Sequence, residues 1–198
     1  MIQGPDFVWL HLPKCAGTSL EAALREIWRG DPAYRFDAKD FRKVIWHDNI
    51  DARRRRDPGF ELAGRRVIAN FRRLPHWLLS RVHFEAQRPP HHIVTREMFL
   101  RGDLFERTGT LNRADDYALS YNMPPVDCWI RSENLVEDAA KAFGLDPEIL
   151  RAKRKQVSAL HYIKSLDFWF TKRELADLYA ASPHWAELEL RIYGSLLV

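Results

Sequence analysis

Residues 7–20 constrain the fold of this chain more than any other stretch of its sequence. The apolar run at residues 7–10 is typical of a short buried strand. A turn with Lys14 and Gly17 follows it, and the apolar spacing over residues 18–27 then predicts a helix. A strand, a tight turn and a helix start bring backbone N–H groups to the positive end of a helix dipole, where anions bind. The sequence therefore predicts an anion site at this turn.

The turn differs from the loop of nucleoside triphosphatases in the position of its lysine. That loop has the pattern G-x-x-x-x-G-K-[ST], in which the lysine follows the second glycine. Here Lys14 precedes Gly17, and hydroxyl groups follow at Thr18 and Ser19. Lys14 would add a positive charge, and the two hydroxyls would add neutral hydrogen-bond donors. The alternative interpretation is an ordinary turn between a strand and a helix, with a lysine on the surface.

The same turn resembles the 5′-phosphosulfate loop of sulfotransferases, which is usually written close to H-x-P-K-[TC]-[GA]-G-T-S-L. The matching residues of this chain are His11, Pro13, Lys14, Cys15, Ala16, Gly17, Thr18, Ser19 and Leu20. The resemblance implies that the middle of the loop binds a cofactor phosphate. The residues with this implied role are Lys14, Cys15, Ala16, Gly17, Thr18 and Ser19.

A second anion contact is predicted after the next strand. Residues 67–71 form an apolar run typical of a buried strand, and Pro75 suits the first turn of a following helix. Arg72 stands at the end of the run and Ser80 lies about two turns into the helix, so a guanidinium and a hydroxyl could grip one anion. This spacing resembles the 3′-phosphate motif R-D-P-x-x-R-x-x-S of sulfotransferases, with Arg72 and Ser80 at its two contacting positions.

The chain departs from this second motif at several positions. Arg73 replaces the aspartate, Leu74 replaces the proline, and Trp77 replaces the second arginine. The alternative interpretation is that Arg72 is a surface cation and that Ser80 has no role beyond its place in the helix.

Two later blocks resemble carbohydrate-type sulfotransferases. The first follows a predicted strand at residues 126–130 and matches (D/V)xxxRxENLxxD, with Arg131, Glu133, Asn134, Leu135 and Asp138 in register. We expect Arg131 and Glu133 to tie the strand end to the next helix. The second block joins residues 168–171 to residues 190–194 and resembles the C-terminal segment of the family. The basic stretch before it makes Lys164 and Ser165 weaker cofactor candidates.

Strands that alternate with helices predict an α/β domain with a mainly parallel sheet. With the resemblance, we expect a P-loop-like three-layer domain whose central sheet is flanked by helices. The length of 198 residues suits a single domain over residues 1–198. Residues 85–125 have a looser pattern, which fits either an insertion for acceptor specificity or a packing appendage.

Two anion contacts at two strand ends suit a molecule with two separated phosphates. The resemblance implies that this molecule is 3′-phosphoadenosine 5′-phosphosulfate (PAPS). We therefore expect a PAPS-dependent sulfotransferase that transfers a sulfuryl group to a hydroxyl of a saccharide or glycolipid. Lys14 would offset negative charge on the leaving oxygen. His47, at the end of an apolar run predicted as a strand over residues 44–47, is the candidate base; its alternative role is structural.

Composition limits the other partners. The net charge of +4 suits an anionic cofactor, and no recognisable nucleic-acid module is present. Two cysteines make no disulfide framework, no apolar run approaches the ~20 residues of a membrane span, and no secretory signal is visible, so we expect a cytoplasmic protein. No Cys/His ligand set predicts a metal. The seven tryptophans would suit a homodimer contact in the C-terminal helices.

Two other functions stay open on the sequence. A nucleotide-dependent kinase with a degenerate loop would need carboxylates for magnesium, but the predicted strand at residues 67–71 leads into Arg72 rather than an aspartate. A non-catalytic module that keeps a nucleotide-binding fold would fit the departures near Arg72. Nucleotide selectivity and transfer activity distinguish these alternatives from a sulfotransferase.

Overall fold

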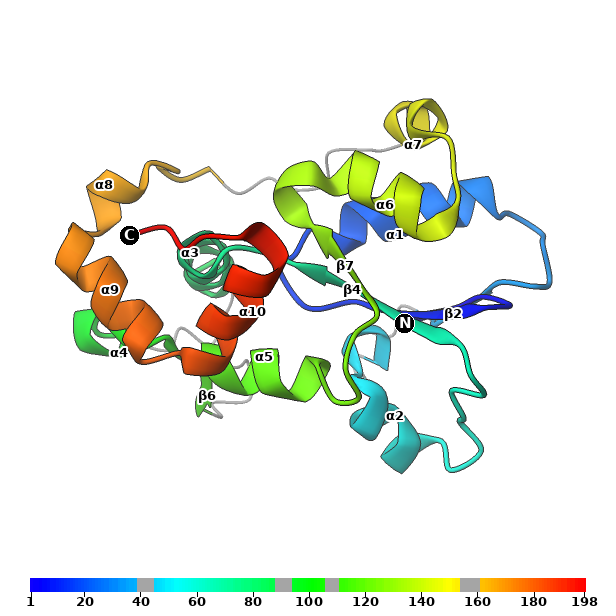
Figure 1. Cartoon of the computed structure of the whole chain (residues 1–198), viewed down its shortest axis with the longest axis horizontal. Coiled ribbons are helices and arrows are strands. Elements are labelled where there is room, and N and C mark those ends of the chain that lie inside the picture. Colours follow the sequence, from blue (N-terminus) through cyan, green and yellow to red (C-terminus); the bar gives the residue numbers. More distant parts are fainter. Residues whose placement is uncertain (39–44, 88–93, 106–110, 154–160) are drawn as a thin grey trace. The chain divides into compact units, whose positions relative to one another are not determined.

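The computed structural model describes residues 1–38, 45–87, 94–105, 111–153 and 161–198 (Figure 1). The chain forms two compact units, and each unit is built from two segments of the chain. The first contains Met1–Phe71 and Ser120–Val157, and the second contains Arg72–Leu119 and Ser158–Val198. The chain thus leaves the first unit directly after Phe71, which is where the sequence places the end of a strand.

The first unit contains a mixed sheet with the strand order β3-β1-β2-β4-β7. Its strands are β1 (Ile2–Gln3), β2 (Phe7–Leu10), β3 (Arg35–Phe36), β4 (Arg66–Phe71) and β7 (Cys128–Arg131). Strand β4 pairs in parallel with both β2 and β7, whereas β1 is antiparallel to β2 and to β3. The predicted α/β class is confirmed, but the sheet is mixed rather than mainly parallel. A short turn joins β1 to β2, and so short a connection allows only antiparallel pairing.

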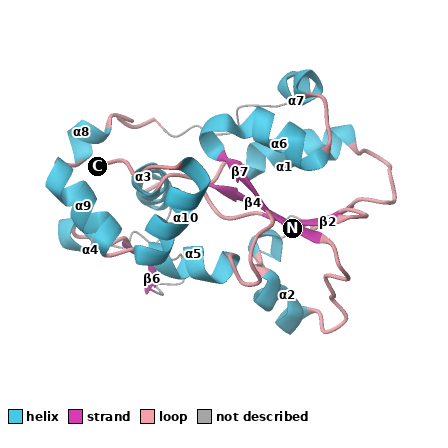
Figure 2. Cartoon of the chain, in the orientation of Figure 1, coloured by secondary structure: helices cyan, strands magenta, loops and turns pink. Residues whose placement is uncertain are grey.

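Helices flank this sheet (Figure 2). Helices α1 and α6 lie side by side against one face, and α2 lies on the other side of the sheet (Figure 1). The core beneath α1 and α6 contains Trp9, Ile68 and Ile130, which come from the parallel strands β2, β4 and β7. The helical segments of this unit are α1 (Gly17–Ile27), η1 (Ile45–His47), α2 (Ile50–Arg56), η2 (Ser132–Asn134), α6 (Leu135–Phe143) and α7 (Pro147–Lys153).

The second unit is mostly helical. Its core includes Trp77 and Trp185, whose ring centroids lie 4.6 Å apart. Thr171 and Glu174 form the capping box that their spacing indicates. The elements are α3 (Leu74–Glu85), α4 (Arg96–Leu100), β5 (Asp103–Phe105), β6 (Leu111–Arg113), α8 (Leu166–Trp169), α9 (Lys172–Ala180), α10 (Pro183–Tyr193) and α5 (Ala114–Tyr121), which ends in the first unit. Strands β5 and β6 form an antiparallel pair.

One segment differs from its predicted structure. The predicted strand over residues 44–47 is wrong where the structure describes it, because Ile45–His47 form a 3-10 helix. The run of four arginines lies in helix α2, with Asn49 as its N-cap. Arg53 is buried and pairs with Asp37 and Asp48, so its charge is compensated within the first unit.

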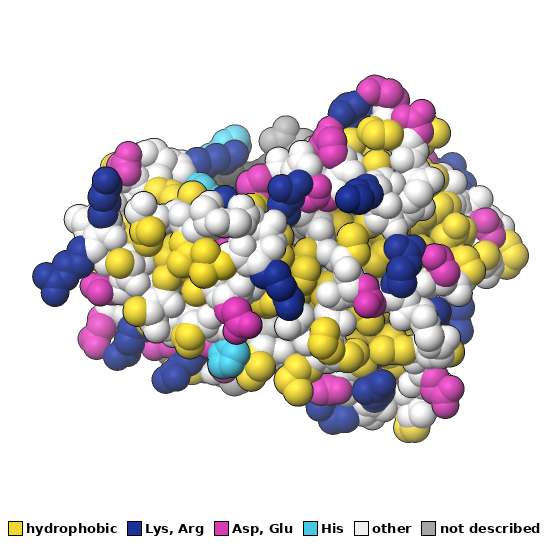
Figure 3. All heavy atoms as spheres, viewed as in Figure 1, with side chains coloured by type: hydrophobic (Ala, Val, Ile, Leu, Met, Phe, Trp, Pro, Cys, Tyr) yellow, Lys and Arg dark blue, Asp and Glu magenta, His cyan; other side chains and the backbone are white. Residues whose placement is uncertain are grey.

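The segment at residues 85–125 divides between the two units. Its part up to Leu119 belongs to the second unit, and the rest belongs to the first. The prediction for residues 88–93 and 106–110 falls outside the described residues. Among the helices that the structure does describe, none is both long enough and apolar enough to cross a membrane. On the face in Figure 3, basic and acidic side chains are interspersed instead of forming one basic field.

Candidate functional site

The loop between β2 and α1 has a strained backbone. Lys14 and Ala16 have positive φ angles of 65° and 62°. Neither residue is a glycine, and a left-handed conformation costs such a residue roughly 1–2 kcal/mol. Left-handed residues in a loop can turn neighbouring N–H groups toward an anion. In this loop the N–H of Cys15 donates to the carbonyl of Leu12 at 3.4 Å. Such strain persists only where the surrounding structure holds it in place.

Asn70 holds this loop in place. Its Oδ1 accepts a hydrogen bond from the indole Nε1 of Trp9 at 2.6 Å, and its Nδ2 donates to the carbonyl of Cys15 at 3.0 Å. The side chain is fully buried, so these bonds form in a medium of low dielectric constant. Sequence analysis missed Asn70, although a polar amide inside an apolar strand was a signal for it.

Gly17 is needed because His11 lies against it. A Cβ atom on Gly17 would overlap the imidazole ring of His11, so no side chain fits at this position. His11 is 2% exposed, and its ring packs 5.3 Å from Trp9 and 4.4 Å from His47 between centroids. The imidazole Nδ1 is 3.8 Å from the buried carboxylate of Glu21 on α1. The close approach of His11 to the helix start thus requires a glycine at position 17.

The first turn of α1 has no side-chain cap. Ala16 is the N-cap, its side chain forms no capping hydrogen bond, and the turn contains no acidic residue. The first backbone N–H groups of any helix lack partners within the helix, and the dipole is positive there. Thr18 is exposed at this end, and Lys14 and Ser19 are partly exposed. Together these groups offer a positive, donor-rich surface.

His47 lies beside the first residue of the loop. Its Nδ1 is 2.8 Å from the carbonyl oxygen of His11. Because a carbonyl only accepts, Nδ1 must carry a hydrogen, and in the neutral ring the lone pair is on Nε2. The hydroxyl of Tyr121 donates to the backbone carbonyl of His47 and fixes it further. His47 therefore has a defined tautomer although its predicted strand is absent.

The other candidates belong to the second unit. Arg72 follows Phe71 directly, and its carbonyl accepts a hydrogen bond from the Nε1 of Trp185 at 3.1 Å. Ser80 lies on α3 and is only 5% exposed. Lys164 and Ser165 are exposed just before α8. Residues 14–19 and His47 thus lie in the first unit, where Gly17 and His47 both contact His11, and these four residues lie in the second unit.

The block after β7 has a structural role. The guanidinium of Arg131 forms two hydrogen bonds with the carboxylate of Asp138, at 2.7 and 2.8 Å, and Asn134 donates to the same group at 2.8 Å. Burial raises the pKa of Asp138, but the bonds from Arg131 and Asn134 outweigh it, so the pKa lies below its ordinary value. Arg131 ties the strand end to the helix start, as predicted, through its bonds to Asp138.

Comparisons of the chain with protein-family models, curated proteins and solved structures found no match. Within the described part of the chain, no group of three His, Cys, Asp or Glu side chains is arranged to hold a metal ion.

Proposed function

We propose that this chain is a PAPS-dependent sulfotransferase that acts on a hydroxyl of a saccharide or glycolipid. The observation that carries the proposal is the loop before α1, whose left-handed Lys14 and Ala16 are held by a buried Asn70 at an uncapped helix start. This geometry suits a phosphate-like anion, and the resemblance of residues 11–20 supplies the identity of that anion. We further propose a cytoplasmic location and a homodimer.

Lys14 and the loop amides have the chemistry to assist sulfuryl transfer. Bound PAPS would supply the sulfuryl group, whose bond to the 5′-phosphate oxygen breaks as a bond to the acceptor oxygen forms. The leaving oxygen gains negative charge, which the ammonium of Lys14 and the first N–H groups of α1 would offset. The backbone conformation at Lys14 and Ala16 is set before any ligand arrives, so the backbone needs little reorganisation.

His47 is the proposed base in this reaction. The acceptor hydroxyl must lose a proton as it attacks, and a neutral imidazole can take it. The hydrogen bond between Nδ1 and the carbonyl of His11 leaves Nε2 as the atom that receives the proton. Because His11 begins the loop, this base lies in the same unit as the proposed 5′-phosphate site.

The 3′-phosphate is assigned to Arg72 and Ser80 by the resemblance alone, and Lys164 and Ser165 are weaker candidates.

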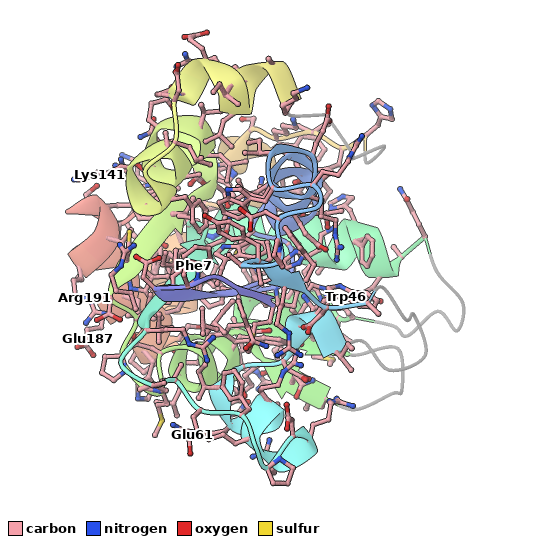
Figure 4. All side chains as sticks on the ribbon, turned by 90° about the vertical axis from the view of Figure 1, so that its right-hand side faces the viewer. Phe7, Trp46, Glu61, Lys141, Glu187 and Arg191 are labelled. Carbon is pink, nitrogen blue, oxygen red and sulfur yellow. The ribbon has the colours of Figure 1, made fainter. Side chains whose placement is uncertain are left out.

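Calorimetric binding of 3′-phosphoadenosine 5′-phosphate (PAP), adenosine 5′-monophosphate (AMP) and ATP tests the whole assignment. We expect PAP to bind most tightly, Lys14→Ala to weaken PAP and AMP alike, and Arg72→Ala to weaken PAP alone. Lys141→Ala, which removes an exposed cation of α6, is the matched control (Figure 4).

Each result of this titration has a defined meaning. Equal binding of ATP and PAP, or no binding, would overturn the sulfotransferase proposal, and magnesium-dependent use of ATP would support the kinase.

The second candidate function is a non-catalytic nucleotide-binding module. The pairing of Arg73 with Glu189 favours it, because that pairing commits a motif position to another contact. Selective PAP binding without transfer to a panel of hydroxyl acceptors would establish the module.

A further inference from the structure

Helix α10 forms hydrogen bonds with Arg72, Arg73 and Leu74, the first three residues of the second unit. The indole Nε1 of Trp185 donates to the carbonyl of Arg72 at 3.1 Å. The carboxylate of Glu189 accepts from the backbone N–H of Leu74 at 2.7 Å and from Nη1 of Arg73 at 3.2 Å. These contacts span more than 110 residues of sequence, so they could not be seen in the local pattern. They fix the backbone on both sides of Arg73.

Glu189 is the centre of this arrangement. Its side chain is fully buried, and the hydroxyl of Tyr179 also donates to it at 2.7 Å. A buried carboxylate is costly unless donors surround it, and here a side-chain cation, a hydroxyl and a backbone amide do so. Leu74 is the first residue of α3, so Glu189 also caps that helix from a distance.

Arg73 connects the same arrangement to the end of α10. Its guanidinium lies 4.3 Å from the ring centroid of Tyr193 and donates to the carbonyl of Ser195 at 2.9 Å. The motif that this segment resembles has an aspartate at position 73. In this chain the acidic group comes instead from Glu189, and the arginine at position 73 is paired with it.

We propose that Glu189 is a positioning residue for recognition of the nucleotide 3′-phosphate. By holding Arg73 and the N–H of Leu74, it sets the backbone at Arg72 and the start of the helix that carries Ser80. This inference rests on the proposed function, because it gives Arg72 and Ser80 their phosphate. It explains how the chain recognises a 3′-phosphate without the aspartate of the motif.

The ratio of PAP affinity to AMP affinity tests this role, because the two ligands differ only in the 3′-phosphate. The variant Glu189→Gln keeps the shape of the side chain but removes the charge that pairs with Arg73. We expect it to lower PAP affinity about tenfold and to leave AMP affinity unchanged. The matched control is Glu187→Gln, an exposed residue of the same helix (Figure 4), which should change neither affinity.

A purely structural role for Glu189 predicts other results. An equal loss of PAP and AMP affinity, or an unchanged ratio in a folded Glu189→Gln variant, overturns the inference. If thermal unfolding shows that this variant does not fold, Tyr179→Phe removes one donor to Glu189 and leaves the other two. In that variant, a loss of PAP affinity of about threefold with unchanged AMP affinity supports the positioning role. An unchanged PAP affinity overturns it.

The same experiment separates this inference from the proposed function. A wild-type chain that does not prefer PAP over AMP and ATP overturns the proposed function, and the positioning role with it. A wild-type chain that prefers PAP through Lys14 and Arg72, combined with a Glu189→Gln variant that keeps this preference, overturns only the positioning role.

Discussion

The two proposed phosphate contacts of this chain follow β2 and β4, which are neighbouring strands of the sheet, but the contacts are held in different ways. The loop at residues 11–19 matches its motif, and it is fixed by Asn70 and His11, which lie on or beside the strands that flank it. The segment at residues 72–74 departs from its motif and is fixed by α10. The loop is thus supported by a residue of the neighbouring strand β4, whereas the altered segment depends on a helix more than 110 residues away in the sequence.

The largest effect is expected at His47. His47→Ala removes the proposed base, so turnover should fall by about 10²- to 10⁴-fold while PAP affinity stays unchanged. Steady-state kinetics and calorimetry measure these two quantities. His184→Ala, which changes an exposed histidine of the second unit, is the control. Near-wild-type turnover in a folded His47→Ala variant would show that this side chain is structural.

Asn70→Ala should weaken the first contact through the fold. It leaves the indole N–H of Trp9 and the carbonyl of Cys15 without this buried partner, and we expect a loss of about 3 kcal/mol in the free energy of unfolding. PAP and AMP affinity should fall together, because both ligands share the 5′-phosphate. Asn70→Asp keeps the acceptor for Trp9 and loses the donor to Cys15, so it separates the two bonds. A loss of PAP affinity without a loss of AMP affinity in Asn70→Ala would contradict the role of Asn70 in the 5′-phosphate contact.

Arg73→Met should weaken the second contact selectively. It leaves the buried carboxylate of Glu189 without its cation, at a cost of about 3 kcal/mol in the free energy of unfolding. Urea unfolding gives this cost, and calorimetry should show a loss of PAP affinity with AMP affinity retained. Arg173→Met, on the exposed side of α9, controls for loss of charge. A fall in AMP affinity as large as that in PAP affinity would remove the distinction between the contacts.

The smallest effect concerns pH and the block after β7. Because the pKa of Asp138 is lowered in the folded state, its contribution to stability is present above its unfolded pKa of about 3.9 and is lost as pH falls through the folded value. Urea unfolding between about pH 6 and pH 2.5 should show this loss. The loss should be smaller in Asp138→Asn, and an identical pH profile for both proteins would refute the assignment.

Local signals in the sequence predicted the local parts of the structure. The strand, turn and helix of residues 7–27, the capping box at Thr171 and the link at Arg131 each have a pattern that is visible within a few residues of sequence. The predicted strand ending at His47 was wrong because a run of four residues cannot distinguish a strand from a 3-10 turn. That turn is held by Arg53, whose guanidinium donates to the carbonyl of Ile45 at 3.1 Å.

The candidate site was only partly predictable, because residues from other parts of the chain hold it in place. Residues 14–19 and His47 share the first unit, but neither Asn70 nor Glu189 was expected to support a phosphate contact. Asn70 was visible as a polar residue within an apolar run. Glu189 had no such signal, because an acidic residue in an amphipathic helix is ordinarily on the surface.

Because the first unit is built from two segments of the chain, the order of synthesis affects when the loop at residues 11–19 can fold. Strand β4 pairs with β7, and α6 covers the same core as α1, yet β7 and α6 come from the second segment. A nascent chain that has reached only Phe71 would contain every residue of the loop but would leave one edge of β4 open to other chains. Synthesis must continue past α6 before the loop can have its full support. Proteolytic fragments that end between the two segments should therefore aggregate and should not retain the anion site.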